Sequence, residues 1–267
     1  MFSGQQPPVV ATIAGSDTGG AAGLAADLKS FAAFGVHGVY ALTMLTAQNT
    51  TGISSVQVLD AAFIAAQLDA LLADYDLAAT KTGLLFSEQA VAEVVTRANA
   101  LGSLVVDPVL VRSSGTPLVA PEVVQRYQKD LIPLADLITP NVAEASLLSG
   151  VEVDSVHTAL IAANMLRERG AQAVVVTGVS EGARMADVLV DGDGDTVLRH
   201  AAIDTPNVLG TGCSFSASVA SNLALGNGLA VSVEAARDFV HAGVRSGAKW
   251  RLGAGQGPID HMARFRP

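Results

Sequence analysis

The chain has 267 residues, of which 50% are hydrophobic and 4% aromatic, and it contains 26 glycines and a single cysteine. This size and composition predict one large α/β domain over residues 1–267, with a sizeable core. The lone cysteine excludes an internal disulfide framework, and the formal net charge of −9 excludes a nonspecific nucleic-acid surface, which needs clustered Lys and Arg.

The chain then alternates apolar strand-like runs with segments of helical spacing, which is the pattern of a parallel sheet crossed by helices. Residues 1–8 carry neither a basic stretch nor a long apolar run, so we expect a cytoplasmic protein with no membrane partner. The predicted strands are Val9–Ala14, Val39–Leu45, Ala78–Thr82, Ser103–Asp107, Leu137–Thr139 and Ala173–Thr177. The predicted helices are Leu24–Phe34, Ala61–Leu72, Ser87–Leu101, Pro121–Leu131, Ser155–Arg169 and Ser214–Leu225.

The loop after the first strand, from Ala14 to Gly23, contains four glycines and Asp17. It matches neither the dinucleotide fingerprint nor the P-loop pattern. A glycine-rich turn of this kind is either a plain connector or a ligand loop, and both interpretations stay open. Because ligands of open α/β sheets bind beyond the carboxyl ends of the strands, the residues that follow each strand are the candidates for a site.

Carboxylates follow two of the predicted strands. Asp107 ends one strand before Pro108, where it is well placed to hold Mg²⁺ through oxygen or water. Asn141 and Glu144 follow the next strand at the spacing of a capping box. A helix cap is the simpler interpretation; the alternative gives Glu144 a share of the same cation, and neither excludes the other.

The stretch Asp187–His200 differs from the rest, because two short apolar runs flank Asp191-Gly192-Asp193-Gly194-Asp195. This predicts a hairpin and therefore an antiparallel edge of the sheet. The acidic tract lacks the later Glu of a calcium loop, so we interpret it as a solvated turn.

Cys213 lies in Gly210-Thr211-Gly212-Cys213, a small-residue turn that opens into the helix Ser214–Leu225. Backbone N–H groups of such a turn, together with the helix dipole, make an anion hole. A thiol at this place is expected to have its pKa lowered from about 8.5 towards neutrality, so that it accepts a proton from an attacking alcohol. The alternative is a buried structural cysteine. An anion hole, carboxylates for Mg²⁺ and a base are together what phosphoryl transfer requires.

Seven blocks, in order along nearly the whole chain, resemble the vitamin-kinase branch of the ribokinase superfamily. The closest resemblance is to the hydroxymethylpyrimidine/phosphomethylpyrimidine kinases of thiamine biosynthesis. Gly-Thr-Gly-Cys together with Thr-Pro-Asn-x-x-Glu is fairly specific for this branch, since sugar kinases usually carry Asp where Cys213 stands. The blocks lie at residues 14–29, 46–52, 80–85, 106–109, 138–144, 210–213 and 255–261.

The resemblance implies a three-layer αβα fold with a mainly parallel central sheet, the use of ATP and Mg²⁺, and a small heterocycle with a hydroxymethyl group as substrate. It implies that Cys213 is the base and that Asp107 and Glu144 hold Mg²⁺. It implies an anion hole from the amides of Gly210, Thr211, Gly212 and Cys213, nucleotide contacts at Asn141, Thr177 and Gly178, and a substrate pocket at Gly15, Asp27, Gln48, Leu84 and Val109. Gln48 would hydrogen-bond the pyrimidine, because a primary amide offers a paired donor and acceptor.

Two departures accompany the resemblance. Thr177-Gly178-Val179 stands where the family commonly has Lys-Gly-Gly, and Leu209 stands where pyrimidine kinases often have His. Arg184 and Lys81 are candidate substitutes for the missing cation. The missing lysine suggests a catalytically weak vitamin-binding or regulatory protein as one alternative. Pyridoxal kinase on the same scaffold is another, because both substrates carry a hydroxymethyl group on a ring.

Further points stay open. These are whether the monophosphate is a second substrate, and whether Gly255–His261 covers the nucleotide or ties down the last helix. A homodimer is expected only by analogy with the superfamily.

Overall fold

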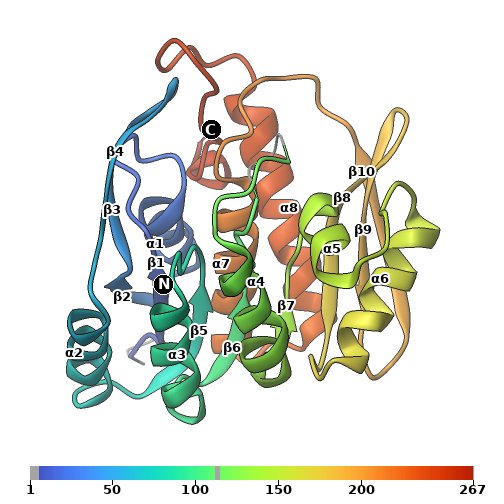
Figure 1. Ribbon diagram of the computed structural model, residues 1–267. Helices are drawn as coiled ribbons and strands as arrows, with labels where there is room; N and C mark the ends of the chain where they lie inside the picture. The colour runs from blue at the N-terminus through green and yellow to red at the C-terminus, as the bar shows by residue number, and fades with distance from the viewer. Residues whose placement is uncertain (1–5, 112–114, 267) are drawn as a thin grey trace.

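The computed structural model describes residues 6–111 and 115–266, and it is built on an eight-stranded sheet of order β10-β9-β8-β7-β6-β5-β1-β2 (Figure 1). From β2 to β8 the neighbouring strands pair in parallel. The carboxyl ends of these strands therefore meet at one edge, where the site lies. The strands are β1 (Val9–Ala14), β2 (His37–Leu42), β5 (Leu77–Thr82), β6 (Ser103–Val106), β7 (Leu137–Ile138) and β8 (Val174–Glu181).

Helices cover both faces of the sheet, which confirms the expected three layers (Figure 1). One face carries α1 (Gly23–Phe34), α7 (Thr211–Ala224) and α8 (Leu229–Gly247). A separate core cluster lies on each side, so the central strands are apolar on both faces. The other face carries α2 (Ala61–Leu72), α3 (Glu88–Arg97), α4 (Pro121–Arg126), α5 (Val142–Ser149) and α6 (Val156–Glu168). No helix in the described ranges combines the length and apolar character needed to cross a bilayer.

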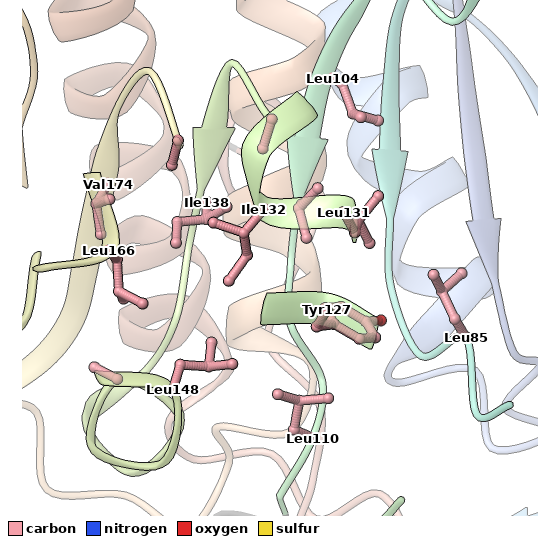
Figure 2. Close-up of a cluster of buried hydrophobic side chains, with 14 of the residues drawn as sticks. Leu85, Leu104, Leu110, Tyr127, Leu131, Ile132, Ile138, Leu148, Leu166 and Val174 are labelled. Carbon is pink, nitrogen blue, oxygen red and sulfur yellow. The ribbon is translucent and has the colours of Figure 1, made fainter. Parts of the chain in front are cut away.

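The larger core cluster packs around Tyr127 (Figure 2). Residues 127–131 form a π-helical turn that continues α4, so the predicted helix Pro121–Leu131 exists with a change of winding. The buried Tyr127 hydroxyl donates to the Gly83 carbonyl at 3.2 Å. This bond ties the helical layer to the chain directly after β5, beside the site.

The predicted strand Val39–Leu45 is wrong as a single element. The chain leaves β2 at Leu42, and β3 (Met44–Asn49) pairs with β4 (Gly52–Val58) in a separate two-stranded antiparallel sheet that stands out beside the main one (Figure 1). Thr43 lies at the break, where its hydroxyl donates to the Leu84 carbonyl at 2.7 Å. The break between β2 and β3 is held by tertiary hydrogen bonds such as this one. No Gly or Pro marks it in the sequence, so local signals do not predict it.

The predicted edge hairpin is confirmed. β9 (Arg184–Val190) pairs antiparallel with β10 (Asp195–Ala201), and also with β8, which runs on to Glu181. The Asp191 carboxylate accepts from the N–H groups of Asp193 and Gly194 at 2.8 and 3.2 Å. The acidic tract is thus an Asx-stabilised turn, as interpreted from the sequence.

Candidate active site

A cavity of about 550 Å³ opens at the carboxyl ends of the parallel strands. Segments that are far apart in the sequence converge on it, including the loop after β1, the β3–β4 hairpin, the ends of β5 to β8 and the start of α7. The cavity is lined by most of the residues singled out from the sequence: Gly15, Gln48, Leu84, Asp107, Val109, Asn141, Glu144, Thr177, Gly210, Thr211, Gly212 and Cys213.

The turn before α7, residues 209–213, is called the anion loop below. Gly210 is the N-cap residue with φ +84°, and a Cβ there would lie 1.8 Å from the Ala21 carbonyl oxygen. Only glycine fits this position. No side chain caps the helix, and no described residue accepts from the N–H groups of Gly212 and Cys213. Free amides at a helix start, bordering a cavity, suit a phosphate group.

The loop after β1 is a wall of the cavity rather than a second anion cup. Its Asp17 carboxylate accepts from the N–H groups of Gly19, Ala21 and Ala22 at 2.8 to 2.9 Å. The loop's own acid therefore occupies the amides that a phosphate would need.

A buried charge cluster lies below the anion loop. The Lys81 ammonium is 3.0 Å from both oxygens of Asp27 and 3.6 Å from Asp107 Oδ2. Burial opposes the charge on Lys81, but these acids hold its pKa above the ordinary value. Asp27 is fully buried and also accepts from the Thr12 hydroxyl at 2.6 Å. It does not border the cavity, so the expectation that Asp27 lines the substrate pocket is not met; its place is to hold Lys81.

Cys213 is half-buried and borders the cavity. Burial, together with the charges of Asp107 and Asp27, raises the pKa of its thiol to about 12, although Lys81 and the Gly23 N–H act in the opposite direction. The expected lowering towards neutrality is therefore wrong for this state of the site. The helix start supplies positive potential, but the two acids and the loss of solvent outweigh it.

Asp107 and Glu144 form an acidic pair at the cavity. Asp107 Oδ2 accepts from the Ser216 hydroxyl at 2.9 Å, and Glu144 accepts from the N–H groups of Asn141 and Leu110 at 3.1 and 3.2 Å. Burial and the neighbouring Asp107 raise the pKa of Glu144 to about 8. The capping box of Asn141 and Glu144 is confirmed, and both residues also border the cavity, so the cap does not remove Glu144 from the place where a cation would bind.

These donors fit a magnesium ion. The charge of Asp107 hinders the ionisation of Glu144, a conflict that a divalent cation would relieve, and the buried Thr139 hydroxyl at the same cavity has no partner among the described residues. Within residues 6–111 and 115–266 no group of three or more His, Cys, Asp or Glu side chains could hold a metal, so a cation here would have two carboxylates as its protein ligands of these types. Mg²⁺ commonly binds through one or two carboxylates plus water and substrate phosphates, which matches this pair.

A second cavity of about 280 Å³ meets the first at Thr177, Val208, Thr211 and Gly212. Gly178 borders this second cavity and not the first, and its N–H donates to Asp187 at 2.9 Å. Three residues that border this second cavity carry no motif in the sequence and were not predicted: His200, Arg237 and His241. Neither Arg184 nor Lys81 takes the place of the missing lysine, since Arg184 lies outside both cavities and Lys81 is paired with buried acids.

The chain matches the phosphomethylpyrimidine kinase family model over residues 17–260. It is 39% identical to the hydroxymethylpyrimidine/phosphomethylpyrimidine kinase of Rhizobium meliloti, over 96% of this chain and 98% of that protein. Among solved structures, an ADP complex of Bacillus subtilis pyridoxal kinase superposes with a TM-score of 0.90 at 36% identity, over 97% of this chain and 99% of that one. The phosphomethylpyrimidine kinase of Clostridium difficile superposes with a TM-score of 0.79 at 33% identity, over 88% of this chain and 98% of that one. The chain belongs to the phosphomethylpyrimidine kinase family and is a phosphotransferase with a ribokinase-like fold.

Proposed function

We propose that this chain transfers the γ-phosphoryl group of ATP to the hydroxymethyl group of 4-amino-5-hydroxymethyl-2-methylpyrimidine, a reaction of thiamine biosynthesis. The observation that carries the proposal is that Gln48, Cys213, the anion loop and the Asp107–Glu144 pair all border one cavity. Its relatives named as pyrimidine kinases over nearly full length support the choice of substrate.

The ring would bind on the side of the hairpin. Met44, Gln48 and Ile53 come from β3 and β4 and border the cavity there, with Leu84 and Val109 also lining it. The side-chain amide of Gln48 has no hydrogen-bond partner within the described residues, so its donor and acceptor are free for an aminopyrimidine edge.

The nucleotide would extend from the second cavity to the anion loop. The two cavities join at Thr177, Thr211 and Gly212, which brings a phosphate chain past the free amides at the start of α7. Arg237 supplies a positive charge at the second cavity. Asp107 and Glu144 would hold Mg²⁺, which when bound neutralises phosphate charge.

In the reaction, the hydroxymethyl oxygen forms a bond to the γ-phosphorus while the bond from that phosphorus to the bridging oxygen breaks, and ADP leaves. We propose that the thiolate of Cys213, which is the minor form near neutral pH because the thiol pKa is about 12, accepts the hydroxyl proton. Transfer proceeds through a loose transition state, so the proton leaves late and positioning matters more than a fully ionised base. Lys81 is the buried cation that favours the thiolate.

Pyridoxal is the second candidate substrate, because the superposition on Bacillus subtilis pyridoxal kinase has the higher TM-score of the two structures described above. Both vitamins carry a hydroxymethyl group on a heteroaromatic ring. The difference lies at Gln48, whose free amide favours the aminopyrimidine.

The test compares wild type with Cys213→Ala and Gln48→Met in turnover assays on both vitamins with ATP and Mg²⁺. We expect Cys213→Ala to lose at least about 10²-fold in kcat, in the range of a lost general base, and Gln48→Met to raise KM for the pyrimidine alone. Full activity of Cys213→Ala would remove the thiol from the mechanism. Tight vitamin binding without turnover in wild type would indicate a regulatory protein, in keeping with Thr177 at the place of the family lysine.

A further inference from the structure

Residues 253–258, called the strap below, connect the end of α8 to the C-terminal turn and touch the tip of the β3–β4 hairpin (Figure 1). The Gly255 N–H donates to the Thr50 hydroxyl at 3.1 Å. A Cβ at Gly255 would lie 1.9 Å from the Thr50 carbonyl oxygen, and one at Gly253, where φ is +89°, would lie 2.4 Å from Thr50 Oγ1. The strap and the hairpin tip therefore fit together without room for a side chain at either glycine.

The other end of the strap is fixed to the anion loop. The Leu209 N–H donates to the Gly257 carbonyl at 3.1 Å, and Leu209 bridges to Pro258 in parallel. A Cβ at Gly257 would lie 2.3 Å from Asn207 Oδ1, and the buried Asn207 amide donates to the Gly247 and Trp250 carbonyls. The strap thus joins the two parts of the site that meet substrate, the hairpin and the phosphate end.

Gln256 lies at the middle of the strap, between these two attachments. It is half-buried and borders the first cavity, but it does not border the second. Its side-chain amide has no hydrogen-bond partner in the part of the chain that the structure describes. The side-chain amide of Gln48 is also unpaired among the described residues. Gln48 lies two residues before Thr50, and Gln256 lies directly after Gly255, so each glutamine is close in sequence to one partner of the Thr50–Gly255 contact. The contact between Thr50 and Gly255 holds the hairpin tip and the strap together, and the two unpaired amides that these segments carry border one cavity.

We propose that Gln256 is a second specificity-determining residue, whose side-chain amide contacts the heteroaromatic substrate together with Gln48. This inference rests on the proposed function, since it names a further contact to the same ring. An amide has two donors and an acceptor, so it suits ring nitrogens, an exocyclic amine or the hydroxymethyl oxygen. Gln256 is outside the second cavity, where the end of the nucleotide away from its phosphates would lie, so we assign its contribution to the vitamin.

The test measures steady-state kinetics of Gln256→Ala with Gln57→Ala as the matched control. Gln57 is an exposed glutamine of β4 that borders neither cavity. We expect Gln256→Ala to raise KM for hydroxymethylpyrimidine about 3- to 10-fold, as for one lost hydrogen bond, with KM for ATP unchanged and no effect of Gln57→Ala. Thr50→Val, which loses the hydroxyl but keeps the size, should raise the same KM by a smaller factor.

The outcomes separate this inference from the proposed function. If wild type turns over the pyrimidine and Gln256→Ala has the same KM, or a raised KM for ATP instead, the inference is wrong and the proposed function stands. If wild type phosphorylates neither vitamin, the proposed function fails. Calorimetric titration of wild type and Gln256→Ala with each vitamin then decides the inference, because equal dissociation constants would overturn it. Circular-dichroism melts verify that each variant is folded.

Discussion

The ionisation of Cys213 gives the sharpest test of the site's electrostatics, because the chain has no other cysteine and a thiol reagent reports on this residue alone. With a pKa of about 12, the thiolate fraction at pH 8 is about one in 10⁴, whereas an ordinary thiol of pKa about 8.5 is about one-quarter ionised. The more basic thiolate is also the better nucleophile, which recovers about 40-fold of this difference at a Brønsted slope of about 0.45. We therefore predict thiol–disulfide exchange roughly 60-fold slower than in an unfolded chain.

The assay follows reaction with Ellman's reagent between pH 7 and 10, in the absence of Mg²⁺ and nucleotide. The same protein unfolded in guanidinium chloride is the control. Because restricted access lowers the rate by the same factor at every pH, the shape of the profile is the decisive feature: the logarithm of the rate should rise with pH to the end of the range. A plateau near pH 8 to 9 would refute the reasoning, since it would mark an ordinary thiol pKa. Asp107→Asn removes a charge that raises the thiol pKa, so this variant should react faster while losing kinase activity.

Three further predictions concern the charges around the cavity. Lys81→Met leaves Asp27 and Asp107 buried without their cation and should lower the free energy of unfolding by about 3–5 kcal/mol; a urea midpoint equal to wild type would contradict the ion-pair account. Burial and Asp107 raise the pKa of Glu144 to about 8 in the folded protein, from the ordinary value of 4.5, so the unfolded chain loses this proton first. The free energy of unfolding in EDTA should therefore fall between about pH 5 and 8, by up to about 1.4 kcal/mol per unit. Glu144→Gln should remove this slope, and a slope that persists in the variant would assign it to other groups. Thr177→Lys places a cation where the two cavities meet and should lower KM for ATP about 3- to 10-fold, because it adds one charge-assisted hydrogen bond to a phosphate, weakened by solvent. An unchanged KM for ATP would show that the phosphates lie elsewhere.

The elements predicted correctly are those whose signals are local. β1 is a continuous apolar run because both of its faces are covered, and the Asp191–Gly194 turn is fixed by side-chain hydrogen bonds to its own backbone. The β3–β4 hairpin was missed because β4 is nearly all exposed and its apolar alternation is short, limited to Val56 and Val58. α8 was not assigned at all, so the cavity residues that it carries, Arg237 and His241, could not be found.

The site residues divide in the same way. The positions of Asp107, Glu144 and the anion loop follow from where parallel strands end and a helix begins. The ionisation of the Cys213 thiol does not follow from its own segment, because it depends on Asp27, Lys81 and Asp107, which come from three other parts of the chain. A helix start predicts a lowered pKa only while the thiol remains solvated and distant from acids. Burial and neighbouring charge are tertiary properties, and here they reverse the sign.

The most direct test of the proposed function is the ratio of kcat/KM for hydroxymethylpyrimidine to that for pyridoxal, measured on the purified wild-type protein with saturating ATP and Mg²⁺. We predict a ratio well above one, because the free amide of Gln48 matches the aminopyrimidine edge. A ratio below one would contradict the assignment and make the chain a pyridoxal kinase on the same scaffold.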